Sequence, residues 1–324
     1  YDCGDFILLE KFIEINDQIF RHYLDINENG IVDALEFGYQ VWDNGRLISL
    51  DLSYNEDVIM KPDNANELDT TNYRLTVIPD NIGDFDALKY LILNYNEFDS
   101  IPESIGNLTK LKTLNSTENV LKSLPNNIGN LINLKRLVIT HNQLTSLPET
   151  IGNLVSLERF FIHHNNLEDL PESIGNLSQL EWLFLNANFL QSIPESIGNL
   201  EGLKILILDN NLLSYLPESM CHEIDGNLPM YAGLETLSIG NNEFCENEGL
   251  PFCINEDFGS QHCSICDPWE FNIEGYCADS TDYQILQRFL NANSESQLLP
   301  ANTGIPDNAS ECVNEDWWED GRLI

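Results

Sequence analysis

Basic residues are scarce in this chain of 324 residues. Its 15 Lys and Arg residues stand against 53 Asp and Glu residues, which gives a formal net charge of −38 at pH 7. Nucleic acid and anionic membrane surfaces repel a surface of this sign, so neither is expected as a partner. Metal cations, cationic partners or a salty medium suit such a surface better. A plain acidic coat that keeps the chain in solution explains the charge at least as well.

Long apolar runs are missing too. No stretch of about 18 apolar residues occurs, so the sequence predicts no membrane-spanning segment. Apolar residues still make up 42% of the chain, a normal share for a folded protein. The chain begins on Tyr1 rather than Met, with no signal-peptide pattern, and we interpret it as a processed or excised chain.

Recognisable catalytic patterns are also lacking. No Ser/His/Asp order, Gly-rich phosphate loop or paired-carboxylate motif stands out. We therefore do not expect an enzyme.

Cysteine, in contrast, is present eight times, and all but Cys3 lie at residue 221 or beyond. Clustering in an even set near one end favours disulfides and an oxidising compartment. Cys263 and Cys266 form a CxxC, which leaves zinc as a rival, but no second CxxC or His pair follows at zinc-finger spacing. The disulfide candidates, whose connectivity stays open, are Cys221, Cys245, Cys253, Cys263, Cys266, Cys277 and Cys312.

Sequons for N-glycosylation occur at four positions and fit a secretory route, hence an extracellular or cell-surface protein. Two of them lie in a repeated GNL phrase and have a second explanation as accidents of the repeat. The four candidates are Asn107, Asn115, Asn176 and Asn308.

An internal repeat dominates the middle of the chain. The dipeptide Ile-Gly recurs every 23 residues from Ile82 to Ile197, and one full phrase reads LPESIGNLSQLEWLFLNANFLQSI. Self-similarity at this period predicts a solenoid, in which stacked coils bury their leucines together. Within each LxxLxL, alternate side chains point inward, as in a short strand. Insertions at residues 56–73 and 222–229 are expected to form loops.

Asparagine follows the LxxLxL pattern in every coil. Its amide can both donate to and accept from neighbouring turn backbones, so we expect a ladder of stacked side chains. One coil is irregular, because Ser116 stands where the others have an inward Leu or Ile, and we expect a packing deficit there. The ladder residues are Asn55, Asn96, Asn119, Asn142, Asn165, Asn188, Asn211 and Asn242.

These phrases resemble the leucine-rich repeat family, of the 23-residue type with a PESIGNL convex segment. The resemblance implies an α/β solenoid, a leucine-rich repeat horseshoe with short parallel β-strands on its concave face, a helical N-terminal cap and a disulfide-rich C-terminal cap. We expect the cap at residues 1–45, about eight coils at 46–245, the Cys-rich cap at 246–276 and a second cap-like hairpin at 277–324.

The concave face is where leucine-rich repeat proteins commonly bind, by the same resemblance. In the middle coils this face carries an apolar strip beside arginines and histidines. Exposed aromatics and Arg are typical hot-spot residues, although a tolerated mix on a wide sheet is the plainer explanation. The predicted ligand-binding residues are Arg136, Val138, His141, Arg159, Phe161, His163, Trp182 and Phe184.

A second resemblance lies ahead of the repeats. DINENGIVDALE, at residues 25–36, is similar to the twelve-residue EF-hand loop, with helical periodicity on both sides. The resemblance implies a structural Ca²⁺ ion, since no second loop is present to make a sensor pair. A capped helical hairpin without metal is the alternative. The implied ligands are Asp25, Asn27, Asn29, the Ile31 carbonyl, Asp33 and Glu36.

The tail of the chain echoes its head. WEDGRLI at 318–324 repeats WDNGRLI at 42–48, and YQILQRFLNAN at 283–293 aligns with FILLEKFIEIN at 6–16. Residues 277–324 therefore look like a second copy of the N-terminal cap. Cys312 stands where the first copy has Glu36, which suggests a Cys277–Cys312 disulfide in place of the ion. An ordinary C-terminal cap with a chance echo is the alternative.

Two functions follow from these observations. The leading interpretation is an extracellular, calcium-binding structural or adhesive protein that forms one unit of a tandem or end-to-end assembly, such as a filament, matrix or surface layer. The alternative is a receptor-like ectodomain that binds a protein, peptide or glycan on the concave face.

Overall fold

The computed structural model describes residues 3–16, 38–53, 74–221 and 234–244, and the backbone of four short strands at 271–273, 276–278, 318–319 and 322–323. The predicted calcium loop at 25–36, both insertions and the sequon at Asn308 lie outside these described residues. So do the side chains of all cysteines except Cys3 and Cys221.

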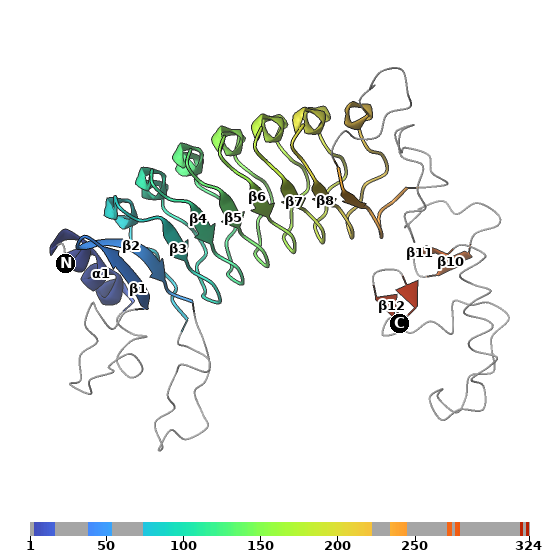
Figure 1. Ribbon diagram of the computed structural model, residues 1–324. Helices are drawn as coiled ribbons and strands as arrows, with labels where there is room; N and C mark the ends of the chain where they lie inside the picture. The colour runs from blue at the N-terminus through green and yellow to red at the C-terminus, as the bar shows by residue number, and fades with distance from the viewer. Residues whose placement is uncertain are drawn as a thin grey trace, which may run out of the picture.

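One nine-stranded sheet runs along the inner side of an arc (Figure 1). From β3 to β8 each residue pairs with the residue 23 positions later, so the sequence period is also the strand register. The predicted short parallel strands are thereby confirmed. The strands are β1 (Tyr39–Asp43) and β2 (Arg46–Asp51), which pair antiparallel, followed in parallel by β3 (Tyr90–Ile92), β4 (Thr113–Asn115), β5 (Arg136–Val138), β6 (Arg159–Phe161), β7 (Trp182–Phe184), β8 (Ile205–Ile207) and β9 (Thr236–Ser238).

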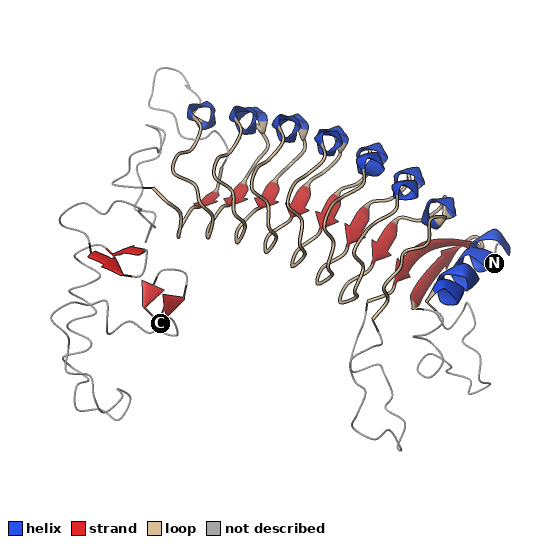
Figure 2. Cartoon of the chain, turned by 180° about the vertical axis from the view of Figure 1, so that it is seen from behind, coloured by secondary structure: helices blue, strands red, loops and turns tan. Residues whose placement is uncertain are grey.

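Short 3₁₀ helices line the outer side of the arc (Figure 2). Six of them start directly after a proline, such as Pro148 with φ −69° and ψ 146°, because the ring fixes φ and the residue needs no N–H partner. The helices are η1 (Ile82–Asp84), η2 (Glu103–Asn107), η3 (Asn126–Asn130), η4 (Glu149–Asn153), η5 (Glu172–Asn176), η6 (Glu195–Asn199) and η7 (Glu218–Met220).

The glycine of the Ile-Gly phrase lets adjacent coils approach closely. A Cβ atom on Gly152 would lie 2.3 Å from the carbonyl oxygen of Ser173, in the next coil. No side chain fits in that space, whereas Ile151 beside it points into the core and is fully buried. The repeated dipeptide therefore combines a core residue with a contact between backbones.

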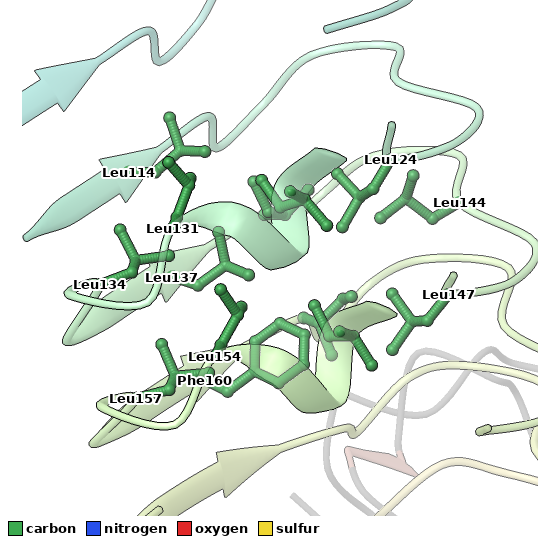
Figure 3. Packing of buried hydrophobic residues seen from close by; sticks show 14 of the residues in the cluster. Leu114, Leu124, Leu131, Leu134, Leu137, Leu144, Leu147, Leu154, Leu157 and Phe160 are labelled. Carbon is green, nitrogen blue, oxygen red and sulfur yellow. The ribbon is translucent and has the colours of Figure 1, made fainter. Parts of the chain in front are cut away.

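A single apolar core fills the space between the strands and the 3₁₀ helices. Figure 3 shows two successive coils, in which Leu131, Leu134 and Leu137 stack on their counterparts Leu154, Leu157 and Phe160. The cluster extends from the N-terminal helix to the last described coil. No coil has a core of its own, as expected for a solenoid.

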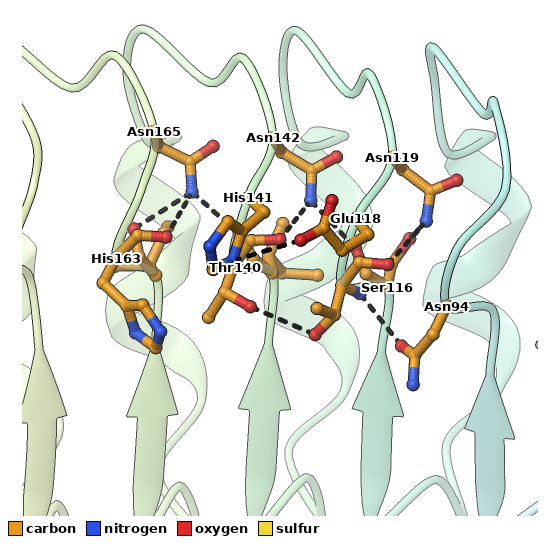
Figure 4. Close-up of polar contacts among 12 residues, drawn as sticks. Asn94, Ser116, Glu118, Asn119, Thr140, His141, Asn142, His163 and Asn165 are labelled. Atoms are coloured by element: carbon orange, nitrogen blue, oxygen red, sulfur yellow. Dashed lines mark hydrogen bonds and ion pairs between the residues drawn. The ribbon is translucent and has the colours of Figure 1, made fainter.

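The predicted asparagine ladder is confirmed in the described coils (Figure 4). Asn142 is representative. Its Nδ2 donates to the carbonyl oxygens of Ser116, 2.8 Å away, and Thr140, 3.0 Å away. Its Oδ1 accepts from the backbone N–H of Leu121 at 3.0 Å. Each amide thus satisfies buried backbone groups of its own coil and of the preceding coil.

The expected packing deficit at Ser116 stays a prediction, but the polar group of this residue has a partner. The side chain is fully buried, but its hydroxyl oxygen accepts a hydrogen bond of 3.1 Å from Asn119 Nδ2. In this coil the ladder amide bonds to a side chain as well as to the backbone. The inward polar group is therefore paired rather than isolated.

The helix α1 (Cys3–Ile15) lies beside β1 and β2 at the N-terminal end (Figure 1). Its Leu8, Leu9 and Phe12 belong to the common core. The buried carboxylate of Asp5 accepts from Arg46 Nε at 2.9 Å and Nη2 at 3.0 Å, and from the backbone N–H of Leu47. These bonds raise the pKa of Arg46 above its already high value.

Asn16, just after α1, also bonds to the first coil. Its Nδ2 donates to the Val77 carbonyl at 3.0 Å, and its Oδ1 accepts from the N–H groups of Thr76 and Val77.

No helix among the described residues has the length and apolar character needed to cross a membrane.

Candidate functional site

The outward positions of the short strands form the candidate site. Within most three-residue strands the middle residue is buried in the core and the flanking two face away from it, as the pleat requires. Arg136 on β5, Arg159 and Phe161 on β6, and Trp182 and Phe184 on β7 therefore lie on one continuous face. We call these five residues the aromatic-arginine patch.

The patch is held together by stacked and edge-to-face contacts. The guanidinium carbon of Arg159 lies 4.5 Å from the Trp182 ring centroid, and that of Arg136 lies 5.3 Å from the Phe161 ring. Phe161 in turn meets Phe184 edge-on, with centroids 4.9 Å apart. Each arginine thus lies over an aromatic ring of the next strand, an arrangement that restricts its side chain.

The predicted apolar strip is only partly correct. Phe161, Trp182 and Phe184 are half-buried, as are Ile205 and Ile207 on β8. Val138, however, is only 7% exposed. Its short side chain pairs in register with the larger Phe161, so it lies below the surface. Val138 therefore adds little to the exposed part of the strip, and its predicted contact with a ligand stays a prediction.

Two ion pairs border the patch, at the position just before each strand. Lys135 bonds to Glu158, and Lys204 bonds to Glu181 at 2.8 Å. The Lys204 hydrogen bond lowers the pKa of Glu181, which also feels the charge of Arg159. Sequence reasoning missed these pairs, although the alternating Lys and Glu before the strands are visible in the sequence. Both of these carboxylates are therefore already paired with lysines.

Three histidines, the predicted His141 and His163 together with His164, gather at the C-terminal ends of β5 and β6. The rings of His141 and His164 stack with centroids 4.2 Å apart, and His163 lies within 5.8 Å of both. Burial, helped by the neighbouring imidazoles, lowers the pKa of His163 to about 4. Glu118 lies 3.9 Å from His141 Nδ1.

His141 and His164 occupy a special backbone position. With φ of 53° and 54° they lie in the left-handed region, one residue before each ladder asparagine. His141 therefore sits in a turn rather than on the strand. Within the described residues, no group of three His, Cys, Asp or Glu side chains is placed to hold a metal ion.

The remaining predicted sites are dispersed. Asn107 and Asn176 are exposed at the ends of η2 and η5. Asn115 lies on β4, half-buried, with its Oδ1 accepting from Thr117 Oγ1 at 2.8 Å. Cys221 is disulfide-bonded, and Cys3 is exposed with a free thiol. The other cysteine pairings remain predictions.

Residues 68–169 match the model of a leucine-rich repeat region. Across these residues the solenoid is similar to a leucine-rich repeat region. No protein with a curated description matches the chain.

Solved leucine-rich repeat structures share this fold. A leucine-rich repeat protein of Leptospira interrogans is 30% identical, with a TM-score of 0.53 over 71% of this chain and 60% of that one. The PEPR1–AtPEP1 structure is 28% identical, with a TM-score of 0.58 over 80% and 35%. The ectodomain of the plant membrane receptor kinase GASSHO1/SCHENGEN3 from Arabidopsis thaliana, in complex with Casparian strip integrity factor 2, is 25% identical, with a TM-score of 0.49 over 74% and 30%. The chain thus spans less than two thirds of each of these proteins.

Proposed function

We propose that the concave face of this leucine-rich repeat array binds a peptide or protein segment outside the cell. The observation that carries the proposal is the aromatic-arginine patch, in which Trp, Phe and Arg side chains lie together and half-exposed. These are the residue types that dominate binding energy at protein interfaces. The PEPR1–AtPEP1 structure contains two components, as its name says. Its likeness in fold to this chain supports the proposal.

The solenoid suits this role because it presents the patch on a rigid support. Each strand is fixed by the ladder asparagine on one side and by the core leucines on the other. The arginines are further restrained by the rings beneath them. Side chains that are ordered before binding lose little entropy on binding, which favours affinity.

Selection from a phage-displayed random dodecapeptide library tests the proposal. Peptides enriched on the wild-type protein are re-measured on the Trp182→Ala/Phe184→Ala variant, where we expect affinity to fall roughly tenfold or more. The matched control is Ile132→Ala/Val155→Ala, which removes two apolar side chains that are 51% and 50% exposed but lie away from the strands. Equal affinity of the selected peptides for the wild-type protein and the patch variant would exclude the concave face as the binding site.

We also propose that Ca²⁺ binds the loop at residues 25–36. Support comes from the ligand pattern of the sequence, and from the position of the loop between α1 and β1, both of which contact the first coil. An ion there would brace the N-terminal end of the array. Isothermal titration with Ca²⁺ should show one binding site in the wild type and none in the Glu36→Gln variant. A melting temperature that excess chelator leaves unchanged would count against calcium binding at this loop.

A tandem or end-to-end structural role is the second candidate. One structural observation favours it. The hairpin of β12 (Trp318–Glu319) and β13 (Arg322–Leu323) pairs Trp318 with Leu323 and Glu319 with Arg322, as β1 and β2 pair Trp42 with Leu47 and Asp43 with Arg46. The tail thus repeats the strand register as well as the sequence of the head. Velocity sedimentation at rising protein concentration should show growing species, whereas a constant monomer speaks against end-to-end assembly.

A further inference from the structure

The two arginines of the patch are cations that form no direct ion pair with a described carboxylate, although Glu181 feels the charge of Arg159. Arg136 and Arg159 form no ion pair within the described part of the chain, although acidic residues outnumber basic ones more than threefold. Glu158 and Glu181, which directly precede β6 and β7, are bound to Lys135 and Lys204. The charge of the arginines is therefore left available on the surface.

Hydrogen-bond donors are left unused as well. Arg159 Nε is buried and has no acceptor among the described residues. A guanidinium stacked on a ring keeps its N–H groups in its own plane, where a carboxylate can bind to two of them at once. Trp182 and Phe161 thus hold the two guanidinium groups in orientations that leave N–H groups available to an acceptor.

The positive character continues beyond the patch. Lys89 and Lys112 occupy the same position before β3 and β4 that Lys135 occupies before β5, and the described residues offer them no ion pair. Within β3 to β7 the outward strand positions carry no Asp or Glu. This half of the concave face is therefore a cationic surface in a strongly acidic protein.

The local charges decide what can bind here, although the net charge is −38. At physiological ionic strength the Debye length is about 8 Å, so a ligand lying on the patch senses mainly the side chains that it contacts. The distant acidic residues are screened. They slow the approach of an anion but do not cancel its contacts with the arginines.

We propose that the segment bound at the patch is an acidic peptide segment, whose Asp or Glu carboxylates pair with Arg136 and Arg159 while an adjoining apolar side chain packs on Phe184 and Ile207. The apolar half of this surface favours a peptide over a sulfated polysaccharide or a nucleic acid, which would leave Phe184, Ile205 and Ile207 uncovered. This inference rests on the proposed binding function and adds the chemistry of the ligand.

The same random dodecapeptide library tests it, at about 150 mM salt. Peptides selected on the wild-type protein should contain an excess of Asp and Glu over the unselected library. In a synthetic copy of the best peptide, with both ends blocked, replacing Glu by Gln or Asp by Asn should weaken binding roughly tenfold or more. The Arg136→Gln/Arg159→Gln protein should lose the same factor and no longer distinguish the two peptides.

The outcomes separate this inference from the function on which it rests. Selected peptides that need Trp182 and Phe184 but show no acidic excess would overturn the inference and leave the proposed function standing. Peptides that do not need those residues, or no enrichment at all, would overturn both. Binding of dextran sulfate is measured as well. If it depends on the arginines while the selected peptides show no acidic excess, the patch is a polyanion site instead. Circular dichroism establishes that each variant is folded. The Ile132→Ala/Val155→Ala variant is the control for the removal of exposed apolar side chains elsewhere.

Discussion

The carboxylate of Asp5 holds the guanidinium of Arg46, 41 residues further along the chain, through two hydrogen bonds of 2.9 and 3.0 Å. Arg46 is the Arg of WDNGRLI, the phrase that returns at the end of the sequence. In the tail, Asp282 precedes the segment that aligns with α1, and Arg322 stands in the repeated phrase.

Removing this carboxylate should destabilise the N-terminal end of the array. Asp5 is almost fully buried, so Asp5→Asn leaves Arg46 and the N–H of Leu47 with a weaker acceptor. We expect a loss of roughly 1.5–3 kcal/mol in the free energy of unfolding, the range for hydrogen bonds to a charged group. Urea denaturation measures it. Asp86→Asn is the control, because Asp86 also pairs with Arg46 but is 64% exposed, and it should cost no more than about 1 kcal/mol.

Adding a methyl group at Gly152 should disturb coil stacking. The new Cβ would meet the Ser173 carbonyl oxygen at 2.3 Å, and backbone there cannot move without separating the coils. Gly152→Ala should therefore cost about 1–3 kcal/mol, the range for overpacking. Gly202→Ala is the matched control, since its nearest neighbour lies at 3.6 Å. Equal melting temperatures for the two variants would contradict the close approach of the coils.

The ladder makes a separate prediction about polar groups. Asn142→Ala would leave the carbonyl of Ser116 and the N–H of Leu121 buried without their partner. Each unsatisfied buried group costs about 1–3 kcal/mol, so for the two groups we expect a loss of about 2–6 kcal/mol. Gln143→Ala, at the exposed neighbouring position, should change the free energy of unfolding by less than about 0.5 kcal/mol. Guanidinium denaturation of both variants provides the comparison.

Acid should weaken the fold through the histidine group. The pKa of His163 is lowered to about 4 in the folded protein, whereas the unfolded chain takes up the proton near pH 6.5. Between these values the unfolded state binds more protons, so stability is complete above about pH 6.5 and falls as the pH drops toward about 4. His141 and His164 are the charged or titratable groups that face His163, and the pKa of His164 is lowered as well. In His163→Gln the loss of stability between about pH 7 and about pH 5 should be smaller than in the wild type, and an unchanged difference would refute this cause.

Much of the fold was predictable because a strict period constrains every coil alike. The spacing of Ile-Gly gave the strand register, and the position of asparagine after LxxLxL gave the ladder, since each depends on contacts repeated at the same place. Which residues face the concave side follows from the same register. Arg159 and Trp182 could thus be placed on one surface before any coordinates were known.

Contacts that depend on side-chain size were not predictable from the period. Val138 is covered because its neighbour Phe161 is larger, and Ser116 is satisfied because Asn119 is within reach. The stacking of Arg159 on Trp182 depends on the side-chain conformations of two adjacent strands. The sequence supplies the candidates for such contacts, and only the coordinates show which of them meet.

The most direct test of the binding surface is to find where a selected peptide attaches. A photo-crosslinking phenylalanine derivative is placed at Phe184 in one protein and at Ile132 in another, and each is irradiated with the same labelled dodecapeptide. We predict peptide attachment at position 184 and none at position 132, which is more exposed but lies outside the strands. Attachment at position 132 alone, or equally at both, would contradict a ligand site on the concave face.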